Sequence, residues 1–452
     1  MVLTNIGSII SDIIDYRGKT PLKLGGNWES PSAENYRALS AKNVKTGKIV
    51  QLDEIRYVSP ELYKKWMKQE VQRGDILITS EAPFGQIFYW NSDEKIVLSQ
   101  RLFAIRVKKN INPKYAYYYM ISQAFQGEMR ARSTGSTVEG LRQPALKRCS
   151  FAYPDLVIQN KIADILWNYD QLIENNNRRI KILEDMAESL YKEWFVRFRF
   201  PGYETAEFEN GIPKGWKISN LLQIINLNDS MRKPLSSLER DAMDKIYPYY
   251  GAAELLDKVD NYIFDGRYLL MGEDGSVITP GGYPVLQYVE GKFWVNNHAH
   301  VISGNNTYPL NFLYCLLKKM PIIDIVTGAA QPKISQGRMQ KKKVVIPTDD
   351  LIKKFCTIVD DIFDDEFCLK ALNEKLVKQR DALLPRLMSG KLEVNINNSN
   401  HGKESFGEIL TLSQYKQQLL QGMAARASSI CISDDDIKAA YEAYVNDRRK
   451  KS

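Results

Sequence analysis

The stretch IADILWNYDQLIENNNRRIKILEDMAESLYKE, residues 162–193, predicts a long helix in this 452-residue chain. Its hydrophobic residues recur at alternating spacings of three and four, the heptad pattern of a helix that buries one stripe against a second helix. The pattern continues for over 30 residues without glycine or proline, which is about 48 Å of helix at 1.5 Å per residue. Charged side chains such as Glu184, Asp185 and Lys192 occupy the other faces. An ordinary helical-bundle core gives a similar stripe, but this length and charge favour a rod-like helix.

A second stretch with the same pattern begins 193 residues later, so the pairing helix lies in the same chain. The predicted seam residues of the first helix are Ile162, Ile165, Tyr169, Leu172, Asn176, Leu183, Met186 and Leu190. Those of the second helix are Phe355, Ile358, Ile362, Leu369, Leu372, Leu376 and Leu383. Polar seam positions such as Asn176, Asp365 and Gln379 tend to fix the register at some cost in stability. We expect the two helices to end at Pro201-Gly202 and Ser389-Gly390.

The repeat extends beyond the helices to the whole chain. Arg17 matches Arg232 at an offset of 215 residues, whereas Pro154 matches Pro347 at an offset of 193. The second copy is therefore about 22 residues shorter in its middle, where loops absorb a deletion. Each copy begins with roughly 150 residues of short strand-like runs separated by Gly, Pro, Asn and Asp. Each copy then ends with its long helix.

Two similar β-rich parts and two matching helices predict a specific geometry. If the helices pack antiparallel, a pseudo-twofold axis places one β-rich part at each end of the pair. Such a protein holds two similar readers a fixed distance apart, which suits duplex DNA with half-sites about 34–36 Å apart. The expected fold class is α+β: two β-rich domains related by an internal repeat, separated by two long antiparallel coiled-coil helices, with a small helical C-terminal tail.

Charge and composition narrow the class of protein. The chain has 62 Lys and Arg against 54 Asp and Glu, a net charge of +8, which permits an acidic partner such as DNA without requiring one. It has five scattered cysteines with no C-x-x-C pair. No apolar run is long enough to cross a membrane, and the N-terminal residues do not resemble a signal peptide. These features predict a reducing cytoplasm and no membrane partner.

Motifs for catalysis are missing from the sequence. Gly18-Lys19-Thr20 resembles the end of a phosphate-binding loop, but Ile13 stands where the first glycine of that loop is needed. His298 and His300 have the spacing that puts two rings on one face of a strand, but no cluster of acidic or cysteine ligands accompanies them. We therefore predict no catalytic residue, no metal site and no cofactor in this chain.

The order of these parts resembles the specificity subunit of type I restriction-modification systems. The resemblance covers roughly residues 1–390 and rests on the layout of the repeat more than on one motif. In chain order, the parts are a β-rich domain, the segment Gly135 to Pro154, a heptad helix, a restart at 211–216 (GIPKGW), a second β-rich domain, the segment Gly328 to Pro347, and a second helix.

This resemblance implies a non-catalytic DNA-recognition subunit. Each β-rich part would be a target recognition domain that reads one half of a bipartite, asymmetric sequence, and the paired helices would act as a ruler for the unspecified spacer. The helices would also dock two modification (methyltransferase) subunits, which use S-adenosylmethionine to methylate adenine. Restriction (endonuclease and translocase) subunits would add ATP-driven translocation and cleavage. S-adenosylmethionine, ATP and Mg are therefore expected on partner subunits.

The boundaries predicted on this basis form six segments. They are target recognition domain 1 at 1–155, spacer helix 1 at 156–200, target recognition domain 2 at 201–348, spacer helix 2 at 349–390, a linker at 391–404 and a helical tail at 405–452. The tail does not match the family pattern. It is either an addition that contacts a partner subunit or a dispensable appendage.

Candidate DNA-binding residues are donors and acceptors in loops, together with basic residues suited to phosphate. In the first domain they are Lys42, Asn43, Ser80, Gln100, Arg101, Thr134 and Ser136, with Lys147 and Arg148 for phosphate. In the second they are Arg232, Lys233, Tyr250, Asp274, Asn296, Asn297, His298, Gln331 and Lys333, with Arg338, Lys341, Lys342 and Lys343 for phosphate. For any one of the loop residues, an ordinary solvated role remains the alternative.

Two other classes of protein stay open. One is a coiled-coil scaffold without a role in DNA binding, and the other is a single-chain DNA-modifying enzyme with an unrecognised catalytic motif. The tail of about 50 residues is too short to hold a nuclease or methyltransferase fold, which disfavours the enzyme.

Overall fold

The structure, a computed structural model, describes residues 1–135, 139–328 and 330–394. The predicted tail at 405–452 and most of the predicted linker at 391–404 lie outside the described residues.

The described chain forms two compact units. The first unit contains residues 1–175 and 372–394, and the second contains residues 176–371. Two long helices, α5 (Leu156–Tyr191) and α9 (Asp349–Met388), each contribute to both units. The first part of α5 and the last part of α9 belong to the first unit, and the remainders belong to the second.

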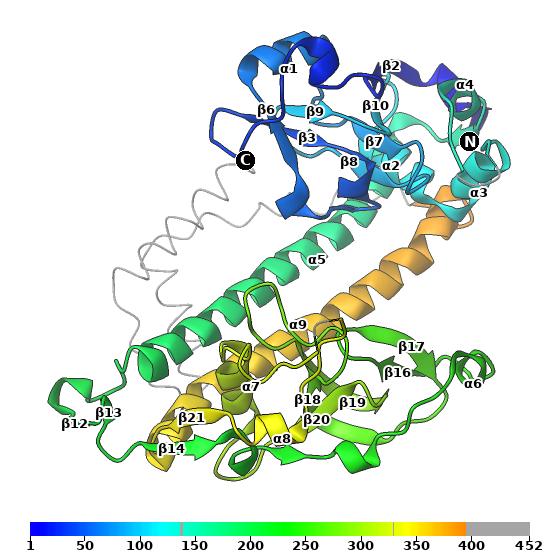
Figure 1. Cartoon of the computed structure of the whole chain (residues 1–452). Coiled ribbons are helices and arrows are strands. Elements are labelled where there is room, and N and C mark those ends of the chain that lie inside the picture. Colours follow the sequence, from blue (N-terminus) through cyan, green and yellow to red (C-terminus); the bar gives the residue numbers. More distant parts are fainter. Residues whose placement is uncertain (136–138, 329, 395–452) are drawn as a thin grey trace, which may run out of the picture. The chain divides into compact units, whose positions relative to one another are not determined.

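The first unit is built on small sheets, which can be followed in Figure 1. Its strands are β1 (Val2–Asn5), β2 (Ile10–Asp15), β3 (Tyr36–Leu39), β4 (Val44–Lys45), β5 (Lys48–Ile49), β6 (Arg56–Val58), β7 (Ile76–Thr79), β8 (Ile87–Tyr89), β9 (Ile96–Leu98), β10 (Leu102–Val107) and β11 (Ser150–Tyr153). They form sheets in the orders β2-β10-β7-β8, β6-β3-β9, β1-β11 and β4-β5. Its short helices are α1 (Pro60–Trp66), α2 (Pro113–Ile121), α3 (Gln123–Ala131) and α4 (Gln143–Lys147), with 3-10 turns η1 (Ile6–Ser8), η2 (Leu22–Leu24), η3 (Ala41–Asn43) and η4 (Leu52–Glu54).

Helix α2 illustrates why the chain folds this way locally. Asn112 accepts a hydrogen bond from the backbone N–H of Tyr115 at 3.0 Å, which caps the helix, and Pro113 occupies its first turn. Tyr115, Tyr118 and neighbouring side chains of α2 are buried against the four-stranded sheet. The start of α5 and the end of α9 pack on the same core, and Arg380 of α9 forms an ion pair with Asp170 of α5 at 2.6 Å.

The second unit repeats this plan with one larger sheet in the order β15-β20-β18-β19-β16-β17. Its strands are β12 (Phe208–Glu209), β13 (Ile212–Pro213), β14 (Lys217–Asn220), β15 (Asn226–Leu227), β16 (Tyr247–Tyr250), β17 (Leu255–Val259), β18 (Phe264–Gly272), β19 (Leu286–Val295), β20 (Ala299–Ser303) and β21 (Lys343–Ile346). Its short helices are α6 (Ser237–Asp241), α7 (Leu310–Lys318) and α8 (Gln336–Met339), with the π-helical turn η5 (Lys192–Val196) and 3-10 turns η6 (Tyr203–Thr205), η7 (Leu221–Gln223) and η8 (Asp229–Met231).

An aromatic cluster forms the centre of the second unit. The ring of Phe355, at the start of α9, lies 4.9 Å from that of Phe195 and 5.9 Å from that of Trp194, measured between centroids. Tyr191 and Phe312 belong to the same cluster. The end of α5, the start of α9 and helix α7 are therefore packed together by aromatic side chains.

The pairing of the strands confirms the predicted internal repeat. Strand β1 pairs antiparallel with β11, with Val2 opposite Tyr153, and β14 pairs antiparallel with β21, with Lys217 opposite Ile346. The first strands are offset by 215 residues and the second strands by 193, the same offsets that the sequence shows. Helices α4 and α8, and then α5 and α9, follow at an offset of 193 at their first residues. The fold class predicted from the sequence, two β-rich domains related by a repeat and two long helices, is confirmed.

The long helices deviate from the prediction at four seam positions and at one end. Leu172, Met186 and Leu372 were expected in the seam but are 51%, 50% and 45% exposed. The side chains that follow Leu172 and Met186 on α5, Ile173 and Ala187, are less exposed. A strict heptad stripe drifts by about 20° per heptad relative to a helix with 3.6 residues per turn, so the predicted stripe leaves the inward face. Gln379, predicted as a polar seam position, is exposed as well, and the other predicted seam residues are buried or half-buried.

The helix ends agree with the sequence only in part. Helix α9 ends at Met388, next to the predicted Ser389-Gly390. Helix α5 ends at Tyr191, well before Pro201-Gly202, because a π-helical turn follows it directly.

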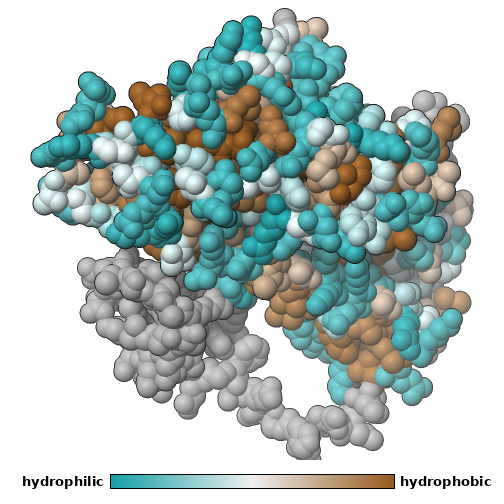
Figure 2. Space-filling model, turned by 90° about the horizontal axis from the view of Figure 1, so that it is seen from below, coloured by the Kyte–Doolittle hydropathy of each residue, from teal (hydrophilic) through white to brown (hydrophobic). Residues whose placement is uncertain are grey.

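No helix in residues 1–135, 139–328 and 330–394 is long and apolar enough to cross a membrane. The face shown in Figure 2 is mostly hydrophilic, with separate hydrophobic patches among the polar side chains.

Candidate nucleic-acid interface

All described loop residues predicted to contact DNA in the first unit line one of two adjoining hollows. The hollows have volumes of about 250 and about 990 Å³. The residues are Lys42, Asn43, Ser80, Gln100, Arg101 and Thr134. Gln100 and Arg101 line both hollows, so the two hollows meet at the turn between β9 and β10. Ser136 lies outside the described residues.

Two of these residues are used to hold the loops. The side chain of Asn43 is buried; its Oδ1 accepts from Ser40 N at 3.1 Å, and its Nδ2 donates to Gln51 O at 3.3 Å. Ser80 is also buried, and its Oγ donates to Arg101 O at 3.3 Å. The remaining four side chains are exposed; Lys42 pairs with Glu54 at 2.6 Å and Arg101 with Glu81 at 3.0 Å.

In the second unit, hydrogen bonds and a β-bridge bring the predicted residues together at the end of β18 and the start of β20. Arg232 Nη1 donates to Asn297 O at 3.3 Å, and Asp274 pairs with Lys333 through an isolated β-bridge. His298 Nδ1 lies 4.0 Å from Asp274 Oδ2. Four loops that are distant in sequence thus converge where β18 ends and β20 begins, two inner strands of the sheet.

The other predicted residues of this unit lie nearby. Asn296 donates its backbone N–H to Tyr250 O at 3.0 Å, and its side chain is buried. Lys233 O accepts from Trp294 Nε1 at 2.6 Å, while the Lys233 side chain is exposed. Gln331 is exposed in the loop before Lys333. In this unit too, buried candidates support the loops and exposed candidates face solvent.

The two units use the same backbone contacts to shape these loops. In the first unit the N–H to O contacts are, in order, Leu141 to Ser80 at 2.9 Å, Thr134 to Gly140 at 3.0 Å and Ser99 to Leu39 at 2.8 Å. The matching contacts of the second unit, in the same order, are Ile334 to Glu273 at 2.9 Å, Thr327 to Lys333 at 2.9 Å and Asn296 to Tyr250 at 3.0 Å. A shared arrangement of loops with different outward side chains is what two readers of different sequences require.

Beneath the loops, an aspartate, an arginine and a glutamine recur. In the first unit Asp15 binds Arg17 at 2.6 Å and accepts a hydrogen bond from Gln143 Nε2. The guanidinium of Arg17 lies 4.8 Å from the centre of the Phe103 ring. Gln143 is the first residue of α4, so this cluster connects the loops to the segment that leads into β11 and α5.

In the second unit the corresponding residues are Asp229, Arg232 and Gln336, and His300 replaces the phenylalanine. Gln336 Nε2 donates to Asp229 Oδ2 at 2.8 Å, and Arg232 Nη2 lies 3.6 Å from the same oxygen. Arg232 Nη1 also donates to Glu273 Oε2 at 2.6 Å. The strand register shows that His300 and Phe103 occupy equivalent positions. Phe103 pairs with Ile78, and His300 pairs with Met271, which is 193 residues after Ile78.

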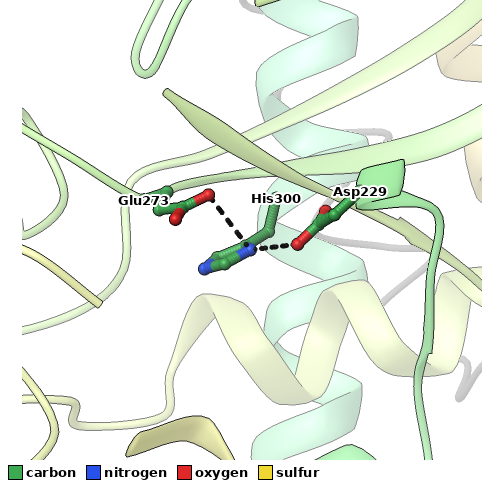
Figure 3. Close-up of side chains that lie close together, drawn as sticks. All are labelled: Asp229, Glu273 and His300. Atoms are coloured by element: carbon green, nitrogen blue, oxygen red, sulfur yellow. Dashed lines mark hydrogen bonds and ion pairs between the residues drawn. The ribbon is translucent and has the colours of Figure 1, made fainter. Parts of the chain in front are cut away.

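Figure 3 shows the ring of His300 between the carboxylates of Asp229 and Glu273. Its Nδ1 lies 2.6 Å from Asp229 Oδ2, and its Nε2 lies 2.8 Å from Ile334 O. The ring therefore lies within hydrogen-bonding distance of a carboxylate on one side and of a backbone carbonyl on the other. The fixed positive charge of Arg232 lies beside both carboxylates.

The pKa of Asp229 reflects these contacts. Burial alone would raise the pKa of this carboxyl, but hydrogen bonds from His300 and from the backbone of Val301 outweigh burial and hold the pKa below its ordinary value.

Asp229, Glu273 and His300 are close enough together to bind a metal ion. Each ligand atom has a hydrogen-bond or ion-pair partner, however, and Arg232 places a fixed positive charge against both carboxylates. The arrangement suits a structural ion-pair network better than a cation site. His298 and His300 do not share a site, because His298 is exposed whereas His300 is buried.

The residues predicted for phosphate contact lie in corresponding segments of the two units. Lys147 and Arg148 are at the end of α4, and Arg338 is in α8; all three are exposed. Lys341 and Lys343 are exposed between α8 and β21 and at the start of β21. The side chain of Lys342 is 13% exposed and forms an ion pair with Asp324 at 2.7 Å, so it is the least accessible of the set.

Comparison with known proteins agrees with this layout. The profile of the type I restriction modification DNA specificity domain matches residues 9–185 and 213–376, which is most of the chain. The chain belongs to this family. It is a type I specificity subunit with two copies of the specificity domain, and the methylation and restriction activities of such systems belong to other subunits.

Relatives of this specificity subunit share most of its length. The type I restriction enzyme MjaIX specificity subunit of Methanocaldococcus jannaschii is 27% identical over 364 residues, covering 75% of this chain and 82% of the relative. The type I restriction enzyme HindI specificity subunit of Haemophilus influenzae is 21% identical, covering 72% of this chain and 88% of the relative. The crystal structure of a type I restriction-modification S subunit from M. genitalium has the same fold, with a TM-score of 0.53 and 18% identity, and covers 85% of this chain and 95% of that one.

Several residues of this specificity subunit's candidate interface were not among those predicted from the sequence. They include Glu81, which pairs with Arg101 at 3.0 Å, and the cluster of Asp15 and Gln143. The offset of 193 relates Glu81 to Asp274, which was predicted, so the repeat itself contained the missing signal.

Proposed function

We propose that this specificity subunit reads one half of a bipartite, asymmetric DNA sequence with each β-rich domain, and that the paired helices set the length of the unspecified spacer. The observation that carries the proposal is the repeated set of loop contacts, which presents different exposed side chains in the two units. The domains would be those expected from the sequence, residues 1–155 and 201–348, with spacer helices at 156–200 and 349–390.

The exposed loop residues are the base-reading candidates in this proposal, and the exposed lysines and arginines of the α4 and α8 segments would contact phosphate. The buried candidates Asn43, Ser80, Asn296 and Arg232 would act by shaping the loops. The long helices would dock two modification subunits, and restriction subunits would join the complex. S-adenosylmethionine, ATP and Mg would be bound by those partners, in the cytoplasm.

DNA binding by the complex with modification subunits tests the proposal against a scaffold without a DNA role. The double variant Lys341→Ala, Lys343→Ala is expected to weaken binding to all duplexes. The slope of log K against log salt should become less negative by about 0.9 for each lost phosphate contact. The preferred sequence should stay the same. Titrations at several salt concentrations measure both effects. The control is Lys258→Ala, an exposed lysine on β17. A salt slope equal to that of the control would contradict phosphate contact by this segment.

The ruler is tested by lengthening both helices at the boundary between the units. Seven residues inserted after Asn175 and seven after Ala371 leave the contacts inside each unit intact and add about 10.5 Å of helix. The preferred spacer is expected to lengthen by about three base pairs at 3.4 Å each, with both half-sites unchanged. Sequencing of methylated sites reads the spacer directly. An unchanged spacer in an active double insertion would refute the ruler, and an insertion in only one helix serves as the out-of-register control.

A further inference from the structure

The two loop sites place an acid and a basic side chain at equivalent positions. In the first unit, Arg101 Nε lies 3.0 Å from Glu81 Oε1, and in the second, His298 Nδ1 lies 4.0 Å from Asp274 Oδ2. All four side chains are accessible: Arg101 is 53% exposed and His298 48%, and the acids are 39% and 23% exposed.

Strand register shows that these pairs occupy the same place in the repeat. Leu102, which follows Arg101, pairs with Thr79, and Ala299, which follows His298, pairs with Gly272. Thr79 and Gly272 are 193 residues apart, as are Glu81 and Asp274. In each unit, therefore, the basic residue directly precedes an inner strand (β10 or β20). The acid is the second residue after the neighbouring strand (β7 or β18).

The surroundings of Arg101 indicate a ligand-facing role. It lies where the two hollows meet, and its backbone φ of +61° is in the left-handed region. Non-glycine residues adopt that region uncommonly, and such strain concentrates at binding sites. Below the pair, an aspartate, an arginine and a glutamine are present in both units, whereas His300 and Glu273 of the second unit stand where the first has Phe103 and Ser80.

We infer that Arg101 and His298 are equivalent base-reading residues, one for each half-site, and that Glu81 and Asp274 are the positioning residues that orient them. This inference rests on the proposed function. The guanidinium of Arg101 has a donor fork that matches O6 and N7 of guanine, while the imidazole of His298 offers a single donor at the same place. The two half-sites differ at this position because the two side chains differ.

The chain offers a matched control for Arg101. Arg73 forms an ion pair with Asp93 at 2.7 Å and is 50% exposed, close to the exposure of Arg101. Arg73 precedes β7 and its partner precedes β9, whereas Glu81 follows β7 and Arg101 follows β9. Arg73 lines neither hollow.

The test uses the full chain in complex with its modification subunits and a randomised duplex library, with sequencing of the bound fraction. Arg101→Ala is expected to reduce the preference for guanine at one position of one half-site by about ten- to a hundredfold. His298→Ala should act on the other half-site only and less strongly. Arg73→Ala should keep every wild-type preference.

Two further variants separate reading from positioning. Glu81→Gln should weaken the preference at the Arg101 position alone, and Glu81→Asp should restore it, which a general effect on folding would not do. Exchanging the pair, with Arg101→His and Glu81→Asp together, should make that position of the first half-site prefer the base read by the second unit.

Each result has a defined reading. If wild type selects a bipartite sequence and both Arg101→Ala and His298→Ala keep all of its base preferences, this inference is wrong and the proposed function stands. The same holds if Arg73→Ala loses as much preference as Arg101→Ala. If wild type selects no sequence at all, the proposed function fails, and this inference fails with it.

Discussion

Asp229→Asn is expected to lower the free energy of unfolding of the second unit by about 3–5 kcal/mol, the usual cost of breaking one side of a buried ion pair. The side chain of Asp229 is 7% exposed, and the variant leaves His300 and Arg232 with less negative charge around them. Urea unfolding of wild type and variant at neutral pH measures the difference.

The same variant should change the acid limb of the stability profile. The folded pKa of Asp229 lies below its ordinary value, so its contribution is present above the unfolded pKa and is lost as the pH falls through the folded pKa. Wild type and Asp229→Asn should therefore differ most at neutral pH and converge below about pH 4. A constant difference across this range would contradict the assignment.

Two controls separate this network from general surface effects. Asp265→Asn, on the exposed side of β18, should leave stability nearly unchanged. His300→Phe introduces the aromatic ring that the first unit has at this position, where Phe103 lies beneath Arg17. We expect it to cost less than Asp229→Asn because Arg232 still lies against Asp229 and Glu273. If His300→Phe were the more damaging variant, the equivalence of the two buried layers would be wrong.

Phe355→Ala is expected to destabilise the second unit by about 3–5 kcal/mol, the range for deleting a fully buried phenylalanine. Its ring is completely buried among the rings of Phe195, Trp194 and Tyr191, so the change leaves a cavity where α5 and α9 meet in this unit. Denaturant unfolding followed by tryptophan fluorescence is the measurement.

The control for this prediction is Leu372→Ala. Leu372 is on the same helix but is 45% exposed, so its truncation should cost far less. Phe355→Leu should lie between the two, because it keeps part of the buried volume. Equal effects of Phe355→Ala and Leu372→Ala would mean that the aromatic cluster does not hold the helices.

The fold could be predicted because the sequence contains the same pattern of strands and helix twice. A heptad stripe and two constant offsets are long-range patterns that survive divergence of individual residues, so the two units and the helix pairing followed from them. The exact inward face did not, and Leu172, Met186 and Leu372 were placed wrongly because a heptad written without the actual helix twist drifts.

The candidate site was predictable in position but not in role. Loop residues with donors and acceptors were found because turns separate the strands, and the structure gathers them at the hollows of the first unit and where β18 ends and β20 begins in the second. Whether a side chain is spent on its own loop, as for Asn43, or left free, as for Gln100, depends on backbone geometry that one sequence does not give. The role of Glu81 was hidden because its partner is 20 positions away.

The two-stranded ladders β1–β11 and β14–β21 bear on how this protein could change. In both ladders a strand near the start of a β-rich domain pairs with the last strand of that domain, so the chain enters and leaves most of the domain through one hydrogen-bonded pair of strands. A gene segment that begins at the first strand of such a ladder and ends at the second would encode a recognition domain together with its own hydrophobic core. Acquiring a new preference would then take one recombination event in place of many matched point mutations.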